Sequence, residues 1–185
     1  MPSLDSNIFK QLKMDNEYPV FIESGTYNGN TIFNMERHFN KLFTIEIAEH
    51  YYNNTKSKYN GNKIKFNLGD SLSVFNTLLP SIDNNTIFFL DGHWSAGDTG
   101  KGIKDCPLIE ECQIINTLFK HNAILIIDDY RLFGKGPSFN NEVCNWEDIS
   151  KDSIINTLKD RITDTYHLPS ELHNEDRLIV HIKSI

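Results

Sequence analysis

The chain has 185 residues, of which 39% are hydrophobic, and it carries a formal net charge of −7 at pH 7. This length supports one well-formed hydrophobic core and is short for two, so we expect a single domain over residues 1–185. The acidic balance argues against a protein that wraps nucleic-acid phosphates, because that binding depends on clustered lysine and arginine side chains.

The N-terminal segment and the cysteines indicate a cytoplasmic protein. No apolar run approaches twenty residues, and Met1–Asp15 lacks the basic stretch and apolar core that mark a secretion signal. Cys106, Cys112 and Cys144 are odd in number and form no Cys-x-x-Cys pair, so we expect free thiols in a reducing compartment. We therefore expect no membrane partner, and a homo-oligomer stays open.

The first predicted elements enclose a glycine turn. Ser3–Met14 carries apolar residues at helical spacing and predicts a short helix that covers one edge of a sheet. Tyr18–Glu23 predicts a strand, and Ser24–Asn30 predicts a turn into a helix that opens near Thr31. Glycines in such a turn let the backbone approach a ligand, and the free N–H groups at the helix start favour its anionic or polar parts.

Two further strands bring acidic residues toward the same edge of the predicted sheet. Glu46 lies near the end of the strand Lys41–Ile47 and 21 positions after Gly25. At that spacing a carboxylate can accept both ribose hydroxyls of an adenosine-type cofactor. The strand Lys63–Asn67 is followed by a turn that contains Asp70. That carboxylate can cap the next helix or bind an adenine amino group, and the sequence favours neither reading.

Two strongly apolar strands end in residues that can react. Thr86–Leu90 is too short for a helix, predicts an interior strand of a parallel sheet, and is followed by Asp91 and His93. Ala123–Ile127 is more apolar still and ends in Asp128–Asp129. Ligands of open α/β sheets bind outside the carboxyl ends of the strands, so these side chains are candidates for a reacting centre.

The carboxylates at these two strand ends predict a bound cation. Neighbouring strands lie about 4.8 Å apart, so Asp91 would repel Asp128 and Asp129 unless a positive charge lay between them. Ligand sets made only of oxygen favour Mg²⁺ or Mn²⁺ over zinc. In the alternative reading, Asp128 or Asp129 caps the following turn while Asp91 pairs with Arg131 or a lysine.

The loops around these strands also suggest roles. The glycine-rich Gly92–Lys104 predicts a mobile lid or a wall of the substrate site. Pro107 fits the first turn of a helix whose Glu110 and Glu111, near its positive end, are assigned a structural role. The segment Arg131–Asn145 has no regular pattern.

The end of the chain completes the predicted sheet. A helix around Ile154–Leu158 precedes two closing strands at Ile162–His167 and Leu178–Ile182. Strands and helices alternate along the chain, and this order predicts an α/β fold with a mainly parallel sheet between helices.

In their order and spacing, four motifs resemble the class I S-adenosylmethionine-dependent methyltransferases. They are Glu23–Gly29 as the first motif, Glu46 as the ribose carboxylate, Gly69–Ser71 on the adenine side and Leu90–Gly92 as the motif of the fourth strand. The resemblance spans most of the chain and implies a Rossmann-like, seven-stranded sheet with S-adenosylmethionine as cofactor. It implies cofactor contacts from Glu23, Gly25, Thr26, Gly29, Thr31, Glu46, Asp70, Ser71 and Asp91.

Within that class, one subgroup is most similar. Leu90–Gly92 together with Ile126–Tyr130 resembles the metal-dependent O-methyltransferases that act on sugar hydroxyls. This resemblance implies Asp91, Asp128 and Asp129 as ligands of Mg²⁺ or Mn²⁺ and a small-molecule or glycan acceptor. Members of the subgroup carry an acidic base where this chain has His93. For Glu23, both a contact with the ammonium group of the cofactor and a salt bridge to a loop stay open.

We expect His93 to act as the general base beside Asp91. Gly92 can turn the chain between them, so the imidazole can face a hydroxyl held at Asp91. An imidazole has an ordinary pKa of about 6.5, and its neutral form can accept a proton near pH 7. Metal ligation and simple surface exposure are the alternative roles for His93.

Other functions fit the same sequence less well. Glu46 and the glycine turn would also suit a nicotinamide-dependent oxidoreductase, but Gly25 and Gly29 do not form Gly-x-Gly-x-x-Gly. A non-catalytic binding module with the same fold is a further alternative. Nucleic-acid methylation is disfavoured by the acidic charge and by the absence of an Asn-Pro-Pro-aromatic tetrapeptide.

Overall fold

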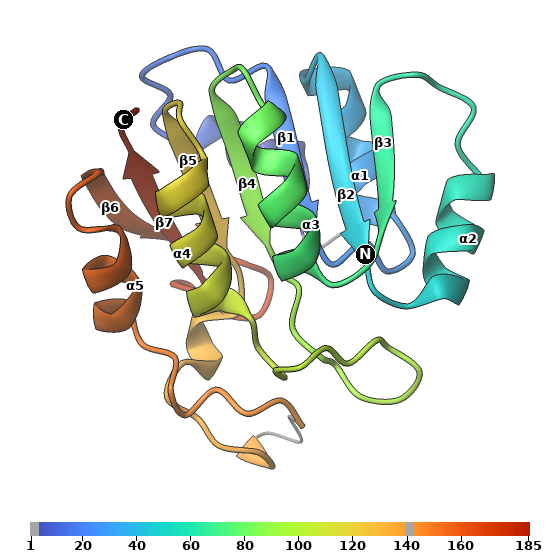
Figure 1. Ribbon diagram of the computed structural model, residues 1–185. Coiled ribbons are helices and arrows are strands. Elements are labelled where there is room, and N and C mark those ends of the chain that lie inside the picture. The colour runs from blue at the N-terminus through green and yellow to red at the C-terminus, as the bar shows by residue number, and fades with distance from the viewer. Residues whose placement is uncertain (1–3, 140–142) are drawn as a thin grey trace.

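A computed structural model of the chain describes residues 4–139 and 143–185 (Figure 1). Ser3 of the expected N-terminal helix and residues 140–142 of the expected irregular segment lie outside the described residues. Seven strands form one sheet in the order β3-β2-β1-β4-β5-β7-β6. Their bounds are β1 (Val20–Ser24), β2 (Lys41–Glu46), β3 (Ile64–Leu68), β4 (Thr86–Leu90), β5 (Ala123–Ile127), β6 (Ile162–Leu168) and β7 (Arg177–Ile182).

The strand directions confirm the expected mainly parallel sheet. The neighbouring pairs among β1 to β5 are parallel, whereas β7 runs antiparallel to both β5 and β6. Every residue of β1, β4 and β5 is buried. A strand covered on both faces has no solvent side, which explains the apolar runs of β4 and β5, whereas β1 ends in the buried polar residues Glu23 and Ser24.

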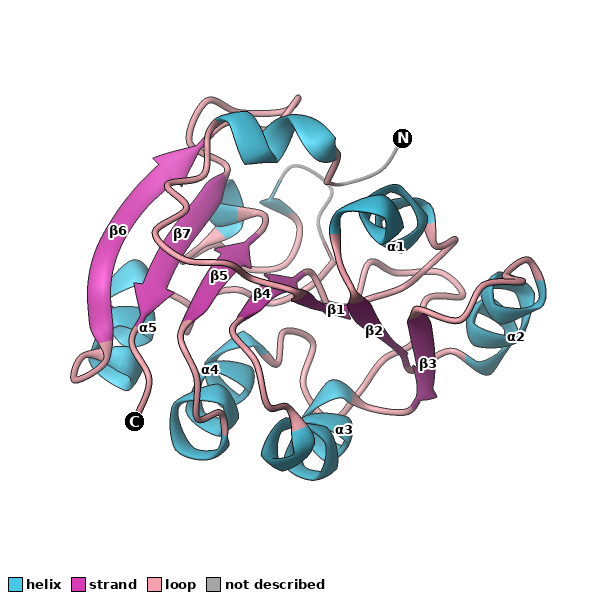
Figure 2. Ribbon diagram, turned by 90° about the horizontal axis from the view of Figure 1, so that it is seen from above, coloured by secondary structure: helices cyan, strands magenta, loops and turns pink. Residues whose placement is uncertain are grey.

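Helices cover both faces of the sheet. The α-helices are α1 (Asn30–Met35), α2 (Glu49–Ser57), α3 (Ser71–Leu78), α4 (Leu108–Leu118) and α5 (Lys151–Leu158). Short 3-10 helices are η1 (Ser6–Lys10), η2 (Glu36–His38), η3 (Leu79–Ser81) and η4 (Tyr130–Leu132). Figure 2 shows α3, α4 and α5 on one face of the sheet, α1 on the other, and α2 beside β3 at the edge.

The hydrophobic core has two parts, one on each face of the sheet. Ile22 and Phe88 point toward the α3–α5 side and pack with Phe75 and Ile115 of those helices. Alternate strand residues face the other side, where they pack with apolar residues of α1 and of the N-terminal segment (Phe21, Phe89, Ile124, Ile32, Met35, Ile8). Because side chains alternate along a strand, each buried strand contributes to both parts.

The N-terminal segment differs from the sequence prediction. It forms only the five-residue 3-10 helix η1, and its apolar side chains lie on a face of the sheet rather than along an edge. The backbone N–H of Lys13 donates to the hydroxyl of Tyr166 at 2.9 Å instead of continuing a helix. Apolar spacing alone could not reveal this competing hydrogen bond.

The strand register brings the predicted site residues to one edge. Ser24 is aligned with Leu90, and Leu90 is aligned with Ile127, so residues 25, 91 and 128 follow at the same level. Cys106, Cys112 and Cys144 are buried free thiols, as expected. Among the residues that the structure describes, no helix combines the length and apolar character that a membrane span requires.

Candidate functional site

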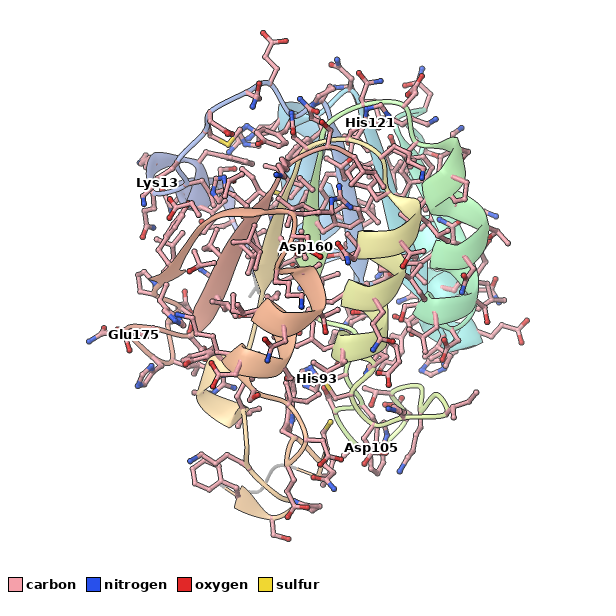
Figure 3. All side chains as sticks on the ribbon, turned by 60° about the vertical axis from the view of Figure 1, so that its left-hand side comes forward. Lys13, His93, Asp105, His121, Asp160 and Glu175 are labelled. Atoms are coloured by element: carbon pink, nitrogen blue, oxygen red, sulfur yellow. The ribbon has the colours of Figure 1, made fainter. Side chains whose placement is uncertain are left out.

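A cavity of about 630 Å³ opens at the carboxyl ends of the parallel strands. Its walls come from the strand ends, from the loop after β4 and from the segment that leads into β7. Figure 3 shows His93 and Asp105 among the loops at this end of the molecule. This is the position at which open α/β sheets bind their ligands.

Five of the predicted cofactor residues line this cavity, namely Gly25, Glu46, Asp70, Ser71 and Asp91. Glu46 is held on both carboxylate oxygens, because it accepts hydrogen bonds from the backbone N–H groups of Tyr27 at 2.7 Å and Ala48 at 2.8 Å. These bonds fix the carboxylate at the end of β2. Each oxygen keeps a lone pair that a ribose hydroxyl can use.

Gly25 lies where the turn after β1 meets the end of β4. Its φ is +88°, and a Cβ added there would lie 2.4 Å from the carbonyl oxygen of Asp91. Only glycine avoids both the strained backbone and this contact. The close approach of the two backbones therefore explains why the turn has a glycine at position 25.

Asp70 has one of its two predicted roles in the structure. Its Oδ1 accepts a hydrogen bond from the backbone N–H of Leu72 at 2.9 Å and thereby caps α3. Asp70 also lines the cavity, so contact with an adenine amino group stays a prediction.

The other four predicted cofactor residues, Glu23, Thr26, Gly29 and Thr31, are not among the residues that line the cavity. Glu23 is 1% exposed and accepts a hydrogen bond from the hydroxyl of its β2 neighbour Thr44 at 2.7 Å. No salt bridge to a loop is found for Glu23 among the described residues. The side chain points within the sheet, and its contact with the cofactor ammonium group stays a prediction.

The remaining three of these residues have packing roles. A Cβ on Gly29 would lie 2.4 Å from Cγ2 of Thr55, so this glycine lets the start of α1 pack against α2. Thr26 hydrogen-bonds to the hydroxyl of Thr44, and the hydroxyl of Thr31 accepts from the backbone N–H of Leu4. The motif was recognised correctly as a turn, but its second half faces protein rather than the cavity.

Glu23→Gln should reduce the loss of stability that the protein undergoes as pH rises. Burial raises the pKa of Glu23 from 4.5 to about 8, although the hydrogen bond from Thr44 acts in the opposite direction. The folded state therefore keeps a proton that the unfolded carboxyl releases. The resulting stabilisation is complete below the unfolded pKa and is lost as pH rises through the folded pKa. Because one pKa unit corresponds to about 1.4 kcal/mol, the wild type should lose several kcal/mol over this range.

Urea unfolding of wild type and Glu23→Gln, at about pH 5 and about pH 9, measures this difference. The exposed Glu17→Gln is the matched control and should follow the wild type. An equally steep pH dependence in the Glu23→Gln protein would show that Glu23 does not carry the effect.

Glu111 lies behind the cavity wall formed by Ser71 and Gly92. It is 1% exposed, and its Oε1 lies 3.3 Å from the position of a Cβ added to Gly92. Burial raises the pKa of Glu111 to about 7, while the hydroxyls of Ser71 and Ser24 favour its charged form. This position agrees with the structural role predicted for the residue.

His93 and two carboxylates meet at the end of β4. Nδ1 of His93 lies 3.6 Å from Oδ1 of Asp91 and 3.5 Å from Oδ2 of Asp129. Nε2 of His93 lies 3.1 Å from the hydroxyl of Ser95, and the imidazole contacts the Trp146 ring with centroids 4.9 Å apart. Surface exposure of His93 is therefore excluded, because only 10% of its side chain is accessible.

Asp128 belongs to a second acidic cluster, with Asp129 and Asp176. Arg131 bridges Asp129 and Asp176, with Nη1 2.7 Å from Oδ2 of Asp176. Nε of Arg177 lies 3.6 Å from Oδ1 of Asp128. Burial, followed by the charge of Asp129, raises the pKa of Asp128 to about 7.

The two clusters differ from the set of metal ligands that the sequence predicted. Ligand atoms of Asp91, His93 and Asp129 lie within 4.8 Å of one another, and those of Asp128, Asp129 and Asp176 form the second such group. The described residues do not bring Asp91, Asp128 and Asp129 together as one group. Asp129, which adopts a left-handed conformation with φ +60°, is the residue that the two groups share. The alternative pairing of Asp91 with Arg131 is also wrong, because Arg131 pairs with Asp129 and Asp176.

The loop after His93 packs against α2 and Ile47 at one end of the cavity. Asp98 accepts a hydrogen bond from the hydroxyl of Tyr51 at 3.0 Å and lies 3.4 Å from Nε2 of His50, both on α2. A Cβ on Gly100 would lie 2.0 Å from Cγ2 of Ile47, so the loop backbone rests directly on that side chain. The loop forms a wall of the cavity, which is one of the two roles predicted for it.

Sequence reasoning missed the residues that precede and begin β7. Ser170, Glu171, Leu172, Asp176 and Arg177 line the cavity beside the two acidic clusters. The available signal was the direction of the last strand. An antiparallel strand starts at the edge where parallel strands end, but the sequence gives no antiparallel mark for β7.

Comparisons with known proteins identify the fold. No protein-family model matches the chain, and no curated protein sequence matches it. A solved structure from Listeria monocytogenes, provisionally assigned as an S-adenosylmethionine-dependent methyltransferase, is 13% identical, with 97% of each chain covered and a TM-score of 0.58. A provisionally assigned methyltransferase from Streptococcus mutans, in complex with S-adenosylhomocysteine (SAH), is 18% identical, with 92% of this chain and 90% of that chain covered and a TM-score of 0.57.

A third similar structure is the O-methyltransferase TomG from Streptomyces achromogenes in complex with S-adenosylmethionine. It is 13% identical, with 90% of this chain and 74% of that chain covered and a TM-score of 0.56. Likeness at this level of identity establishes the fold. The chain has the Rossmann-like fold of the class I methyltransferases, with its seven-stranded sheet and flanking helices.

Proposed function

We propose that this protein is an S-adenosylmethionine-dependent O-methyltransferase, assisted by a divalent metal ion, that methylates a hydroxyl of a sugar or another small molecule. One observation carries the proposal. A single cavity joins the Gly25 and Glu46 end, which suits the methyl donor, to the centre of Asp91, His93 and Asp129. A nicotinamide-dependent oxidoreductase is the weaker reading, because the glycine spacing differs and Gly29 packs against Thr55.

The cofactor end can bind the polar parts of the methyl donor. Glu46 offers the ribose two oxygens whose orientation is fixed by the backbone N–H groups of Tyr27 and Ala48. Gly25 lets the donor approach the backbone, and Asp70 with Ser71 faces the adenine side. When bound, S-adenosylmethionine supplies an activated methyl group on a positively charged sulfur.

The reacting end can hold a divalent ion. Asp91 and Asp129 supply carboxylate oxygens, which are ligands that Mg²⁺ and Mn²⁺ accept, and His93 supplies a nitrogen. The donor set therefore fits a metal. A bound divalent ion would lower the pKa of an acceptor hydroxyl and orient it.

The chain also supplies a proton acceptor at this centre, since Asp91 and His93 lie side by side. One of them takes the hydroxyl proton as the hydroxyl oxygen bonds to the methyl carbon. The electron pair of the broken carbon–sulfur bond stays on sulfur, so the products are a methyl ether and SAH. Holding the hydroxyl and the methyl group in line is the other contribution of the protein.

The charges around the acceptor end favour a small, neutral acceptor over nucleic acid. Asp128, Asp129, Asp176 and Glu171 line this part of the cavity, whereas Arg131 and Arg177 are its arginines. The four acidic side chains would repel phosphate groups, and the whole chain carries a net charge of −7.

SAH should raise the melting temperature of the protein, and NAD should not. A ligand that binds only the folded state stabilises it by an amount that grows with the ratio of ligand concentration to Kd. At about 100 times Kd the expected stabilisation is about 2.7 kcal/mol. Thermal unfolding with each compound measures the effect, and Glu46→Gln should shrink the SAH shift. If NAD bound and neither SAH nor S-adenosylmethionine did, the oxidoreductase would become the favoured function and the methyltransferase the weaker one.

A further inference from the structure

We propose that His93 is a metal ligand through Nδ1, that Asp91 and Asp129 complete the protein ligands of the ion, and that Asp128 is not one of them. This inference rests on the proposed function, because it assigns the ion of the same centre. It replaces the role of general base expected for His93, since a nitrogen bound to a metal cannot accept a proton. The second carboxylate oxygen of Asp91 is then left as the proton acceptor.

The distances fit a single ion. Nδ1 of His93 lies 3.6 Å from Asp91 Oδ1 and 3.5 Å from Asp129 Oδ2. In an octahedral site with bonds of about 2.1 Å, neighbouring ligand atoms are about 3.0 Å apart and opposite atoms about 4.2 Å apart. The observed separations lie between these values, so small side-chain rotations are enough to form the bonds.

The second nitrogen of His93 indicates which nitrogen faces the ion. Nε2 lies 3.1 Å from the hydroxyl of Ser95. If Nε2 carries the ring proton and donates to that hydroxyl, Nδ1 presents its lone pair to the two carboxylates. Three electron-rich atoms then converge, and this arrangement favours a cation between them. Metal-bound histidines typically donate their other N–H to such a partner.

Packing holds the imidazole in this orientation. The ring contacts Trp146 with centroids 4.9 Å apart, and Trp146 in turn stacks on Phe133. Trp146 is only 3% exposed, so it provides a rigid support. An imidazole fixed at both its face and its Nε2 can bind an ion with little further loss of side-chain entropy.

The second acidic cluster already has its positive charge. Arg131 bridges Asp176 and Asp129 Oδ1, and Arg177 lies beside Asp128. These guanidinium groups take the position that a cation would otherwise fill. Asp129 contributes Oδ1 to Arg131 and Oδ2 to the centre at His93, so it can serve both groups at once.

The mixed ligand set predicts which ions the protein prefers. Imidazole nitrogen is a ligand of manganese, iron, cobalt and zinc, whereas Mg²⁺ strongly prefers oxygen. We therefore expect Mn²⁺ and Co²⁺ to bind more tightly than Mg²⁺. The competing arrangement is a protonated imidazole paired with both carboxylates, which needs no ion.

Titration calorimetry of the purified protein with Mn²⁺, Co²⁺ and Mg²⁺ tests the assignment without any acceptor. Mn²⁺ should bind at least about 10-fold more tightly than Mg²⁺. His93→Ala should weaken Mn²⁺ binding by about 100-fold or more, and Ser95→Ala by about 10-fold, because Ser95 only orients the ring. Asp128→Asn should stay within about 3-fold of wild type. The visible absorption of bound Co²⁺ should change in His93→Ala and persist in Asp128→Asn.

Several outcomes would overturn the assignment. Wild-type Mn²⁺ affinity in His93→Ala, loss of Mn²⁺ binding in Asp128→Asn, or no Mn²⁺ binding by the wild type would each do so. The shift in melting temperature with SAH, measured on the same proteins, shows that each variant is folded. It also separates the two proposals. If the wild type bound Mn²⁺ but did not bind SAH, the proposed function would be contradicted and the metal assignment would still stand.

Discussion

Replacing Asp91 with asparagine should lower methyl transfer by about 10²- to 10⁴-fold while changing the affinity for SAH far less. Asp91 follows β4 and lines the cavity, and its Oδ1 lies 3.6 Å from Nδ1 of His93. Asparagine keeps the shape but loses the negative charge that, in the proposed reaction, binds a metal ion and accepts a proton. The interaction is strongest when the hydroxyl reacts, so the effect should appear in kcat.

The measurement is the rate of SAH formation with an acceptor that the wild-type protein methylates, chosen from a panel of sugars and other hydroxylated compounds. Asp160→Asn makes the same chemical change at an exposed residue outside the cavity and should keep the wild-type rate. If Asp91→Asn retained the wild-type kcat, Asp91 would have no part in the chemical step.

Gly25→Ala should abolish measurable SAH binding and lower the melting temperature. The new Cβ would lie 2.4 Å from the carbonyl oxygen of Asp91, a backbone atom that cannot move without shifting the end of β4. The positive φ of +88° adds a cost of about 1–2 kcal/mol for any residue other than glycine. Both effects act at the point where the donor approaches the backbone in the proposed complex.

Gly134→Ala separates the two effects. Gly134 also has a positive φ, +73°, but a Cβ added there would meet no atom within 4 Å. This control should therefore show only the backbone cost and should bind SAH as the wild type does. Equal losses of stability and equal SAH affinities in the two variants would show that the contact with Asp91 is unimportant. Thermal unfolding with and without SAH provides both measurements.

The sequence was sufficient to predict the strands and most of the helices. The short apolar runs at Thr86–Leu90 and Ala123–Ile127 predicted buried strands, and they form β4 and β5 as expected. The positions of Glu46 and Asp91 at the cavity followed from strand order, because the carboxyl ends of parallel strands meet at one edge. These predictions depended on local pattern and on topology, both of which the sequence carries.

Side-chain direction was harder to predict. Gly29 lies in the expected turn, yet it faces Thr55, and Glu23 faces Thr44 inside the sheet. The division of Asp91 and Asp128 between two groups that share Asp129 was not predicted, and no glycine in the sequence marks the positive φ of Asp129. Asp176 was not predicted as a site residue, because it reaches the site from the start of an antiparallel strand, 45 residues after Arg131.

The antiparallel direction of β7 affects the order in which the parts of the cavity form during synthesis. The Gly25 and Glu46 end of the cavity is built from β1 and β2, which leave the ribosome early. The Arg131–Asp176 bridge spans 45 residues and cannot form until β7 pairs with β5. Contacts between residues so far apart in the chain generally form late. A growing chain would therefore acquire the place proposed for the methyl donor before it acquires the oriented Asp129 and the proposed acceptor wall.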